Sequence, residues 1–187
     1  MNVRLCIGAA LLLAAVGSPF AQAAGDREKS VMAFQRIAQV MRSPRCMNCH
    51  TATDHPRQGD AMRHHDQLVM RGADDKGTAP MRCAACHQDA NSAGGHVPGA
   101  PGWRLAPLSM NWERARGDRE LCEGLLDRNR NGNRTAKGLV IHMLNDPLVQ
   151  WAWTPGAGRA VPAIGREEFH ALLRLWESTG AACPPNH

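Results

Sequence analysis

The chain has no tyrosine, and its five tryptophans and three phenylalanines make up only 4% of 187 residues. Aromatic side chains therefore supply little of the surface that a core of this size needs. Clean alternating strand patterns are absent, and so are long apolar runs beyond the first two dozen residues, which argues against a sheet protein and a membrane-spanning one. The net charge of +5 is too modest and dispersed to indicate a nucleic-acid partner.

The first 23 residues have the pattern of a secretory signal peptide. Arg4 gives a positive start, residues 7–16 form an apolar run too short to span a bilayer, and Ala21-Gln22-Ala23 offers a small-x-small cleavage site. An uncleaved N-terminal anchor is the alternative. Cleavage after Ala23 leaves residues 24–187, which we expect to be exported to the bacterial periplasm with no membrane span.

Cysteine and histidine are frequent, with seven and nine residues. Four of the cysteines lie in two copies of C-x-x-C-H, namely Cys46-Met47-Asn48-Cys49-His50 and Cys83-Ala84-Ala85-Cys86-His87. This is the attachment signature of haem c, in which two thiols form thioethers to one edge of the porphyrin and the adjacent imidazole binds the iron as proximal ligand. The sequence therefore predicts two covalently attached haem c groups.

Two other kinds of site use paired cysteines. A zinc site could be built from two C-x-x-C pairs, but it would not require a histidine after each pair. A thioredoxin-like redox site needs one such motif at a helix start rather than two with a trailing histidine. The export signal also favours haem, because haem is attached to cysteine outside the cytoplasm.

The two motifs resemble those of periplasmic multihaem c-type cytochromes. A wider resemblance, over about residues 45–184, is to a family of small di-haem proteins labelled as cytochrome subunits of isoquinoline 1-oxidoreductase-like enzymes. The segments that carry it are Gln58-Gly59-Asp60, Arg71-Gly72, Pro98-Gly99-Ala100-Pro101, Leu105-Ala106-Pro107 and Asp146-Pro147-Leu148-Val149. The resemblance implies an electron carrier, with a dehydrogenase as donor and a cytochrome or oxidase as acceptor.

The predicted fold is mostly α, with cytochrome c-like helices and loops wrapped round two haems and little or no sheet. The motifs begin 37 residues apart, which is too close for a complete mono-haem domain between them, so residues 24–187 are expected to form a single di-haem domain. The haems would supply the aromatic surface that the side chains lack. Apolar spacing and cap residues predict helices over about 26–42, 118–128, 135–143, 147–153 and 166–179. The Gly- and Pro-rich segments 94–107 and 155–165 are expected to line haem edges.

Cys122 and Cys183 remain once the signal peptide and the motifs are set aside. In an oxidising compartment a leftover pair most economically forms one disulfide, which would join the helix after Asp118 to the C-terminal tail. Two buried free thiols are the alternative.

The sixth ligand of each iron separates a carrier from an enzyme. We expect His65, between the two motifs, to be one distal ligand; its choice over His64 rests mainly on the family resemblance. For the other haem, His142 and Met110 remain alternatives. His55, His96 and His170 are poorer candidates.

Two classes of function stay open. The first is a periplasmic electron carrier that transfers single electrons, either free or as the cytochrome subunit of a dehydrogenase, and is not itself an enzyme. The second is a small haem enzyme or gas sensor, peroxidase-like, with one open-coordinate iron. Di-haem peroxidases are larger two-domain proteins, so the length of this chain favours the carrier.

Overall fold

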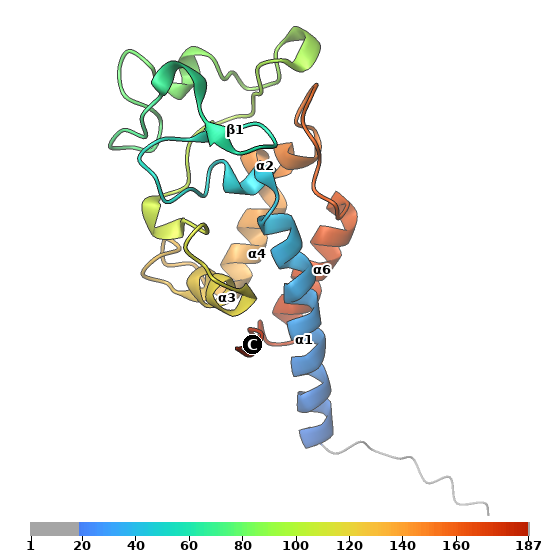
Figure 1. The fold of residues 1–187 in the computed structure, drawn as a ribbon. Coiled ribbons are helices and arrows are strands. Elements are labelled where there is room, and N and C mark those ends of the chain that lie inside the picture. Colours follow the sequence, from blue (N-terminus) through green and yellow to red (C-terminus); the bar gives the residue numbers. More distant parts are fainter. Residues whose placement is uncertain (1–18, 187) are drawn as a thin grey trace, which may run out of the picture.

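The computed structural model describes residues 19–186 and shows a helical base beneath a layer of loops (Figure 1). Helices make up 46% of the described residues and strands 2%, so the prediction of a mostly α chain is confirmed. The α-helices are α1 (Pro19–Met41), α2 (Pro44–Met47), α3 (Asp118–Leu126), α4 (Ala136–Asn145), α5 (Pro147–Gln150) and α6 (Arg166–Ser178). The remaining elements are the 3-10 turns η1 (Asp66–Leu68), η2 (Cys83–Ala85), η3 (Ala93–Gly95), η4 (Leu108–Met110) and η5 (Trp151–Trp153), and the strands β1 (Arg57–Gln58) and β2 (Arg63–His64).

Helix α1 begins at Pro19, seven residues before its predicted start at Asp26. Its first turns are rich in alanine, the residue with the highest helix propensity, and they are exposed; the first buried residue of the helix is Ser30. The predicted cleavage point after Ala23 falls in this exposed start, and residues 1–18 of the predicted signal peptide lie outside the described residues. Within the described part of the chain, no helix is both long and apolar enough to cross a bilayer.

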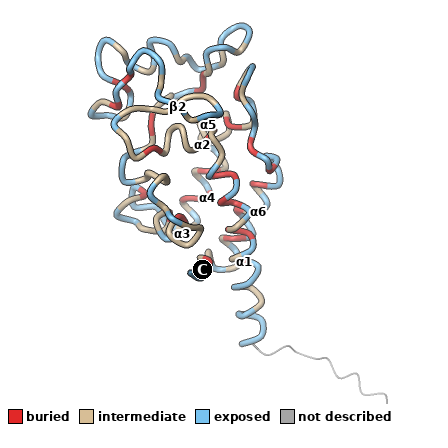
Figure 2. The backbone as a smooth tube through the Cα atoms, viewed as in Figure 1, coloured by how far each residue is buried: buried red, intermediate tan, exposed pale blue. Residues whose placement is uncertain are grey.

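The core of the base forms where α1 packs along α6. Phe34 and Ile37 of α1 are fully buried, as are Leu173 and Trp176 of α6, and the rings of Phe34 and Trp176 lie 5.3 Å apart. The buried Ser30 hydroxyl donates to the carbonyl of Trp176 at 3.1 Å and accepts from the main-chain N–H of Ala182, which follows α6. Figure 2 shows that burial is concentrated in these helices. The two ends of the described chain therefore share one core.

Helices α3 and α4 complete the base, and their caps partly match the sequence. The Thr135 hydroxyl accepts from the N–H of Gly138 at 3.1 Å, and Asp146 caps α5 by accepting from Leu148 at 2.9 Å, as predicted. Asp118 was expected to cap α3, and that expectation is wrong. It is the first helical residue, and its carboxylate instead binds the guanidinium of Arg42 at 2.8 Å.

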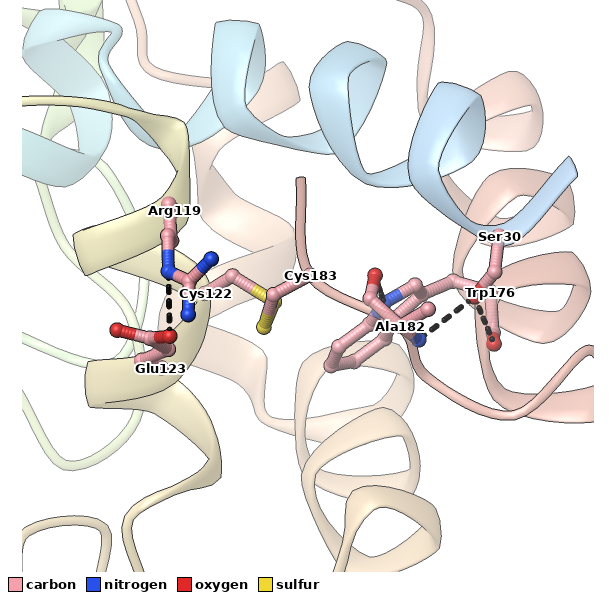
Figure 3. Close-up of a disulfide and its surroundings, with 7 residues drawn as sticks. All are labelled: Ser30, Arg119, Cys122, Glu123, Trp176, Ala182 and Cys183. Atoms are coloured by element: carbon pink, nitrogen blue, oxygen red, sulfur yellow. Dashed lines mark hydrogen bonds and ion pairs between the residues drawn. A yellow bond between two sulfur atoms is a disulfide. The ribbon is translucent and has the colours of Figure 1, made fainter. Parts of the chain in front are cut away.

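Cys122 and Cys183 form a disulfide, which confirms the predicted pairing. It joins α3 to the C-terminal tail, and Figure 3 shows the tail held on its other side by the contact of Ala182 with Ser30 and Trp176. The Cys122 residue is fully buried. The bridge joins α3 to the tail after α6, and the hydrogen bonds of Ala182 with Ser30 and Trp176 hold that tail against α1 and α6.

We expect the double substitution Cys122→Ala and Cys183→Ala to lower the free energy of unfolding by about 4 kcal/mol, because the bridge closes a loop with a sequence separation of 61 residues. Denaturant titration measures the change. Wild-type protein with this bridge selectively reduced is the matched control, since it keeps both sulfur atoms in the core. Native protein in which both thiols can be alkylated would contradict the bridge itself.

The loop layer, residues 51–107, has little regular structure, and Arg71 holds much of it together. This buried arginine donates to the main-chain carbonyls of Thr51, Thr53 and Ala106, and its guanidinium pairs with Asp75 at 2.6 Å. Charged hydrogen bonds of this kind are stronger than those between neutral groups. One polar side chain therefore replaces the apolar packing that holds the helical base.

Candidate cofactor site

The two C-x-x-C-H segments, residues 46–50 and 83–87, fold into the same tight turn. In each segment the N–H of the second cysteine donates to the carbonyl of the first, at 3.1 and 3.2 Å. The histidine N–H donates to that same carbonyl, at 3.0 and 2.9 Å. Both motifs thus bring two thiols and one imidazole to adjacent positions, which is the arrangement that a porphyrin edge requires.

The histidines of both motifs are held in the same way. Nδ1 of His50 lies 2.7 Å from the carbonyl oxygen of Met110, and Nδ1 of His87 lies 2.7 Å from that of Pro98. A carbonyl oxygen can only accept, so Nδ1 carries the proton and donates in both rings. The lone pair of the neutral imidazole is then on Nε2, and this is the usual arrangement of a histidine that binds a metal.

A tryptophan stacks on each of these imidazoles. Trp112 lies on His50 with ring centroids 3.4 Å apart and planes 13° apart, and Trp103 lies on His87 at 4.4 Å and 5°. Trp151 meets Trp103 edge-on at 4.8 Å. The stacking and the hydrogen bond together fix the orientation of each ring.

A cavity of about 580 Å³ opens between the loop layer and the segments around it. Cys49 of the first motif and Cys83, Cys86 and His87 of the second line its wall, together with His65. Its volume lies within the range of about 300–1,000 Å³ typical of small-molecule and cofactor sites. The cavity therefore offers room for a large ligand beside the second motif.

The cysteines of the first motif are half-buried. Burial raises the pKa of Cys46 to about 11 and that of Cys49 to about 12. The neighbouring Cys46 and Cys83 raise the pKa of Cys49 further. Cys49 and Cys83 line the same cavity. The two attachment segments thus converge although 37 residues separate their starts.

The two segments predicted to line haem edges, 94–107 and 155–165, both reach this cavity. They meet at Gly95, whose φ is +72° and where a Cβ atom would lie 2.8 Å from the main-chain nitrogen of Ala157. Only glycine fits such a close approach without strain. Arg159 completes the junction by donating to the carbonyl of Gly95 at 2.7 Å.

The imidazole of His65 lies near that of His87, with ring centroids 6.1 Å apart and planes at 71°. Two imidazoles bound on opposite sides of one metal ion, with metal–nitrogen bonds of about 2 Å, have centroids about 6 Å apart. Nδ1 of His65 donates to the carbonyl of Asp66 at 2.6 Å, which leaves its Nε2 free as in the motif histidines. By contrast, His64 stacks on His55 at 3.9 Å. The geometry favours His65 over its neighbour.

His142 and Met110 both lie near His50, in different ways. Burial lowers the pKa of His50 to about 4, and the nearby His142 also lowers it. Met110 meets His50 through its main-chain carbonyl, on the Nδ1 side, while its side chain packs against the helical core. A distal ligand must reach the metal from beyond Nε2, so this arrangement argues against Met110 and leaves His142 as the other candidate.

Six arginines and one acidic residue, Asp66, are among the lining residues of the cavity, and five of the arginines are paired with carboxylates. The six are Arg45, Arg57, Arg63, Arg82, Arg104 and Arg159. Two buried polar atoms of this wall, Nε of Arg45 and Oδ1 of Asn48, have no hydrogen-bond partner. Buried polar atoms are normally satisfied, but both of these are enclosed by protein and neither is open to a ligand in the cavity.

The zinc interpretation gains no support from the structure. Among residues 19–186, no three His, Cys, Asp or Glu side chains are grouped closely enough to hold a metal ion by themselves. Cys46, Cys49, Cys83 and Cys86 are free, and in this structure they do not form a four-cysteine cluster.

Several residues of the site were not found from the sequence. The main-chain carbonyls of Pro98 and Met110 carry no side-chain signal, and Met110 was considered only as a sulfur ligand. Arg45 and Asp60 could have been noticed, because one directly precedes the first motif and the other lies in a segment that carries the family resemblance. No protein family, curated protein or solved structure matched the chain.

Proposed function

We propose that this protein is a di-haem c-type cytochrome that transfers single electrons between redox partners outside the cytoplasm. The observation that carries the proposal is the repeated geometry of the two motifs. Each motif joins a C-x-x-C turn to an imidazole whose Nδ1 is held by a carbonyl, and one of these imidazoles lies near that of a second histidine, with ring centroids 6.1 Å apart. A chain that used these cysteines only for stability would not need this arrangement twice.

Different residues would attach each haem and bind its iron. Cys46 and Cys49 hold one haem through thioethers and Cys83 and Cys86 hold the other, while His50 and His87 are the proximal ligands. His65 and, as the favoured second candidate, His142 close the distal positions. When bound, each haem c supplies a one-electron ferric–ferrous couple.

Trp103 and Trp112 stack on the two motif imidazoles and hold their orientation. With His65 and His142 as distal ligands, neither site would leave a position for a substrate. This is the behaviour of a carrier rather than of a peroxidase or a gas sensor, which needs an open position.

An oxidising compartment is part of the proposal. The buried Cys122–Cys183 bridge supports it, because such disulfides form and persist outside the reducing cytoplasm. Together with the signal-peptide pattern of residues 1–23, it indicates the periplasm. The partners we propose are a dehydrogenase that donates electrons and a cytochrome or oxidase that accepts them.

Intact mass spectrometry of protein isolated from the periplasm is the direct test. We expect a chain that begins at Ala24 and carries the mass of two haems under denaturing conditions, because thioethers survive unfolding. Replacing Cys83 and Cys86 together with alanine should remove one of the two. A zinc adduct, or wild-type protein without covalent haem, would contradict the proposal.

A further inference from the structure

The carbonyl that holds His87 belongs to a peptide group that is bound at both ends. The C=O of Pro98 accepts from Nδ1 of His87 at 2.7 Å. The N–H of the same peptide group, which is the main-chain N–H of Gly99, donates to Oδ1 of Asn91 at 3.0 Å. One peptide group therefore connects the imidazole of His87 to the side-chain amide of Asn91 through two hydrogen bonds in series.

The side chain of Asn91 is held in one orientation. Its Oδ1 also accepts from the indole Nε1 of Trp151 at 2.9 Å, and its Nδ2 donates to the main-chain carbonyl of Thr154 at 2.8 Å. An N–H group can only donate and a carbonyl oxygen can only accept, so the amide oxygen must be the atom that meets Gly99 and Trp151. The acceptor behind the peptide group is therefore fixed in place.

The peptide group itself is packed tightly on the turn that carries Asn91. A Cβ atom at Gly99 would lie 2.1 Å from the carbonyl oxygen of Ala90 and 2.5 Å from that of Gln88. Only glycine allows such a close approach of two main-chain segments. The hydrogen bond from Gly99 to Asn91 thus has little freedom to lengthen or to turn away.

The first motif is built differently at this point. The C=O of Met110 accepts from Nδ1 of His50 at 2.7 Å, and the N–H of that peptide group, which belongs to Asn111, donates to the main-chain carbonyl of Leu108 at 3.2 Å. Its partner is therefore a carbonyl of the same 3-10 turn, whereas the second motif uses a side-chain amide. The two histidines are held alike, but the groups behind their carbonyls differ.

We propose that Asn91 is a positioning residue for His87 and lowers the midpoint potential of the haem that His87 binds, acting through the Pro98–Gly99 peptide group. This inference rests on the proposed function. Hydrogen bonds in series polarise one another, so an acceptor on the peptide N–H makes its C=O a stronger acceptor for the imidazole. A stronger acceptor at Nδ1 raises the basicity of Nε2 as a ligand. A more basic ligand stabilises ferric iron, which lowers the potential.

The test is the midpoint potential of each haem in the intact holoprotein. Asn91→Ala removes the acceptor, and we expect the equilibrium constant for reduction of one haem to rise about threefold, less than the about tenfold effect typical of losing the direct partner of a metal-bound histidine. A threefold rise corresponds to about 28 mV for a one-electron couple, since tenfold is about 59 mV. The potential of the haem bound by His50 should stay the same and is the internal reference.

Asn91→Asp separates this effect from a purely structural one. A carboxylate still accepts from Gly99 but cannot donate to Thr154, so this variant keeps the acceptor and loses the contact that holds the neighbouring segment. We expect a potential at or below that of the wild-type protein, the opposite of the shift in Asn91→Ala. Equal rises in the two variants, or no shift in Asn91→Ala, would overturn the inference.

Gln88→Ala is the matched control. Gln88 is an exposed amide of the same turn whose Nε2 donates to the carbonyl of Ala84 at 2.8 Å, so its loss should leave both potentials unchanged. If Asn91→Ala fails to take up haem, Asn91→Ser takes its place with the same expected rise, because its hydroxyl is one bond shorter than the amide. Wild-type protein without covalent haem would instead overturn the proposed function, so the two failures are distinguishable.

Discussion

Replacing His65 with alanine is expected to convert one of the two haems to a high-spin form that binds one carbon monoxide molecule per chain. The wild-type protein should bind none. The ring centroids of His65 and His87 lie 6.1 Å apart, and removing the His65 imidazole would open the sixth position of the iron that His87 is proposed to bind. Visible spectra of the reduced protein, titrated with carbon monoxide, measure the change directly.

His64→Ala and His55→Ala are the controls for this variant. These two imidazoles stack on each other at 3.9 Å, so their removal should leave both haems low-spin. His96→Ala should likewise have no effect. If the wild-type protein already binds carbon monoxide at one haem and reduces peroxide rapidly, the enzyme interpretation replaces that of a carrier.

The spin state of the second haem should change in His142→Ala and stay the same in Met110→Leu. His142 lies near His50, whereas Met110 is held by its carbonyl on the Nδ1 side of that ring and packs its side chain into the core. We therefore expect His142→Ala to produce a second high-spin, carbon monoxide-binding haem. Combined with His65→Ala, it should raise the uptake to about two molecules per chain, because each distal position opens independently.

Met110→Leu keeps the backbone carbonyl and most of the side-chain volume, so it should leave the spectrum unchanged. The near-infrared band that a methionine–iron bond gives should be absent from the wild-type protein. A wild-type spectrum with that band, lost in Met110→Leu, would show that the methionine is the ligand and that the favoured assignment of His142 is wrong.

Local signals in the sequence predicted much of the helical base. The cap at Thr135, the Asp146-Pro147 start of α5 and the apolar face of α6 depend on neighbouring residues, and each lies where the sequence places it. Asp118 failed as a cap because an ion pair with Arg42, 76 positions away, competes for its carboxylate. Such a contact depends on the packing of α3 against α1, which no local pattern specifies.

The residues of the candidate site also fall into two groups, those that local spacing predicts and those that depend on the path of the chain. The motif cysteines and histidines follow from spacing alone, because their chemistry needs adjacent residues. The approach of His65 to His87, the carbonyl of Met110 and the pairing of Arg45 with Asp60 arise from the path of the loop layer. That path is held by hydrogen bonds of Arg71 to the main chain, which have no sequence periodicity and could not be predicted.

The placement of the cysteines bears on how the protein matures. Cys122 and Cys183 are joined within the helical base, while the free thiols of residues 46–49 lie at its upper boundary and those of residues 83–86 lie in the loop layer. An oxidising compartment would readily close a C-x-x-C pair into a bridge, and such a bridge would block thioether formation. Because Cys122 and Cys183 lie apart from the motif cysteines, they can pair with each other and leave the motif thiols unpaired. Under the proposed function, the Cys122–Cys183 bridge would form in the base while the thiols of both motifs stay free for haem attachment.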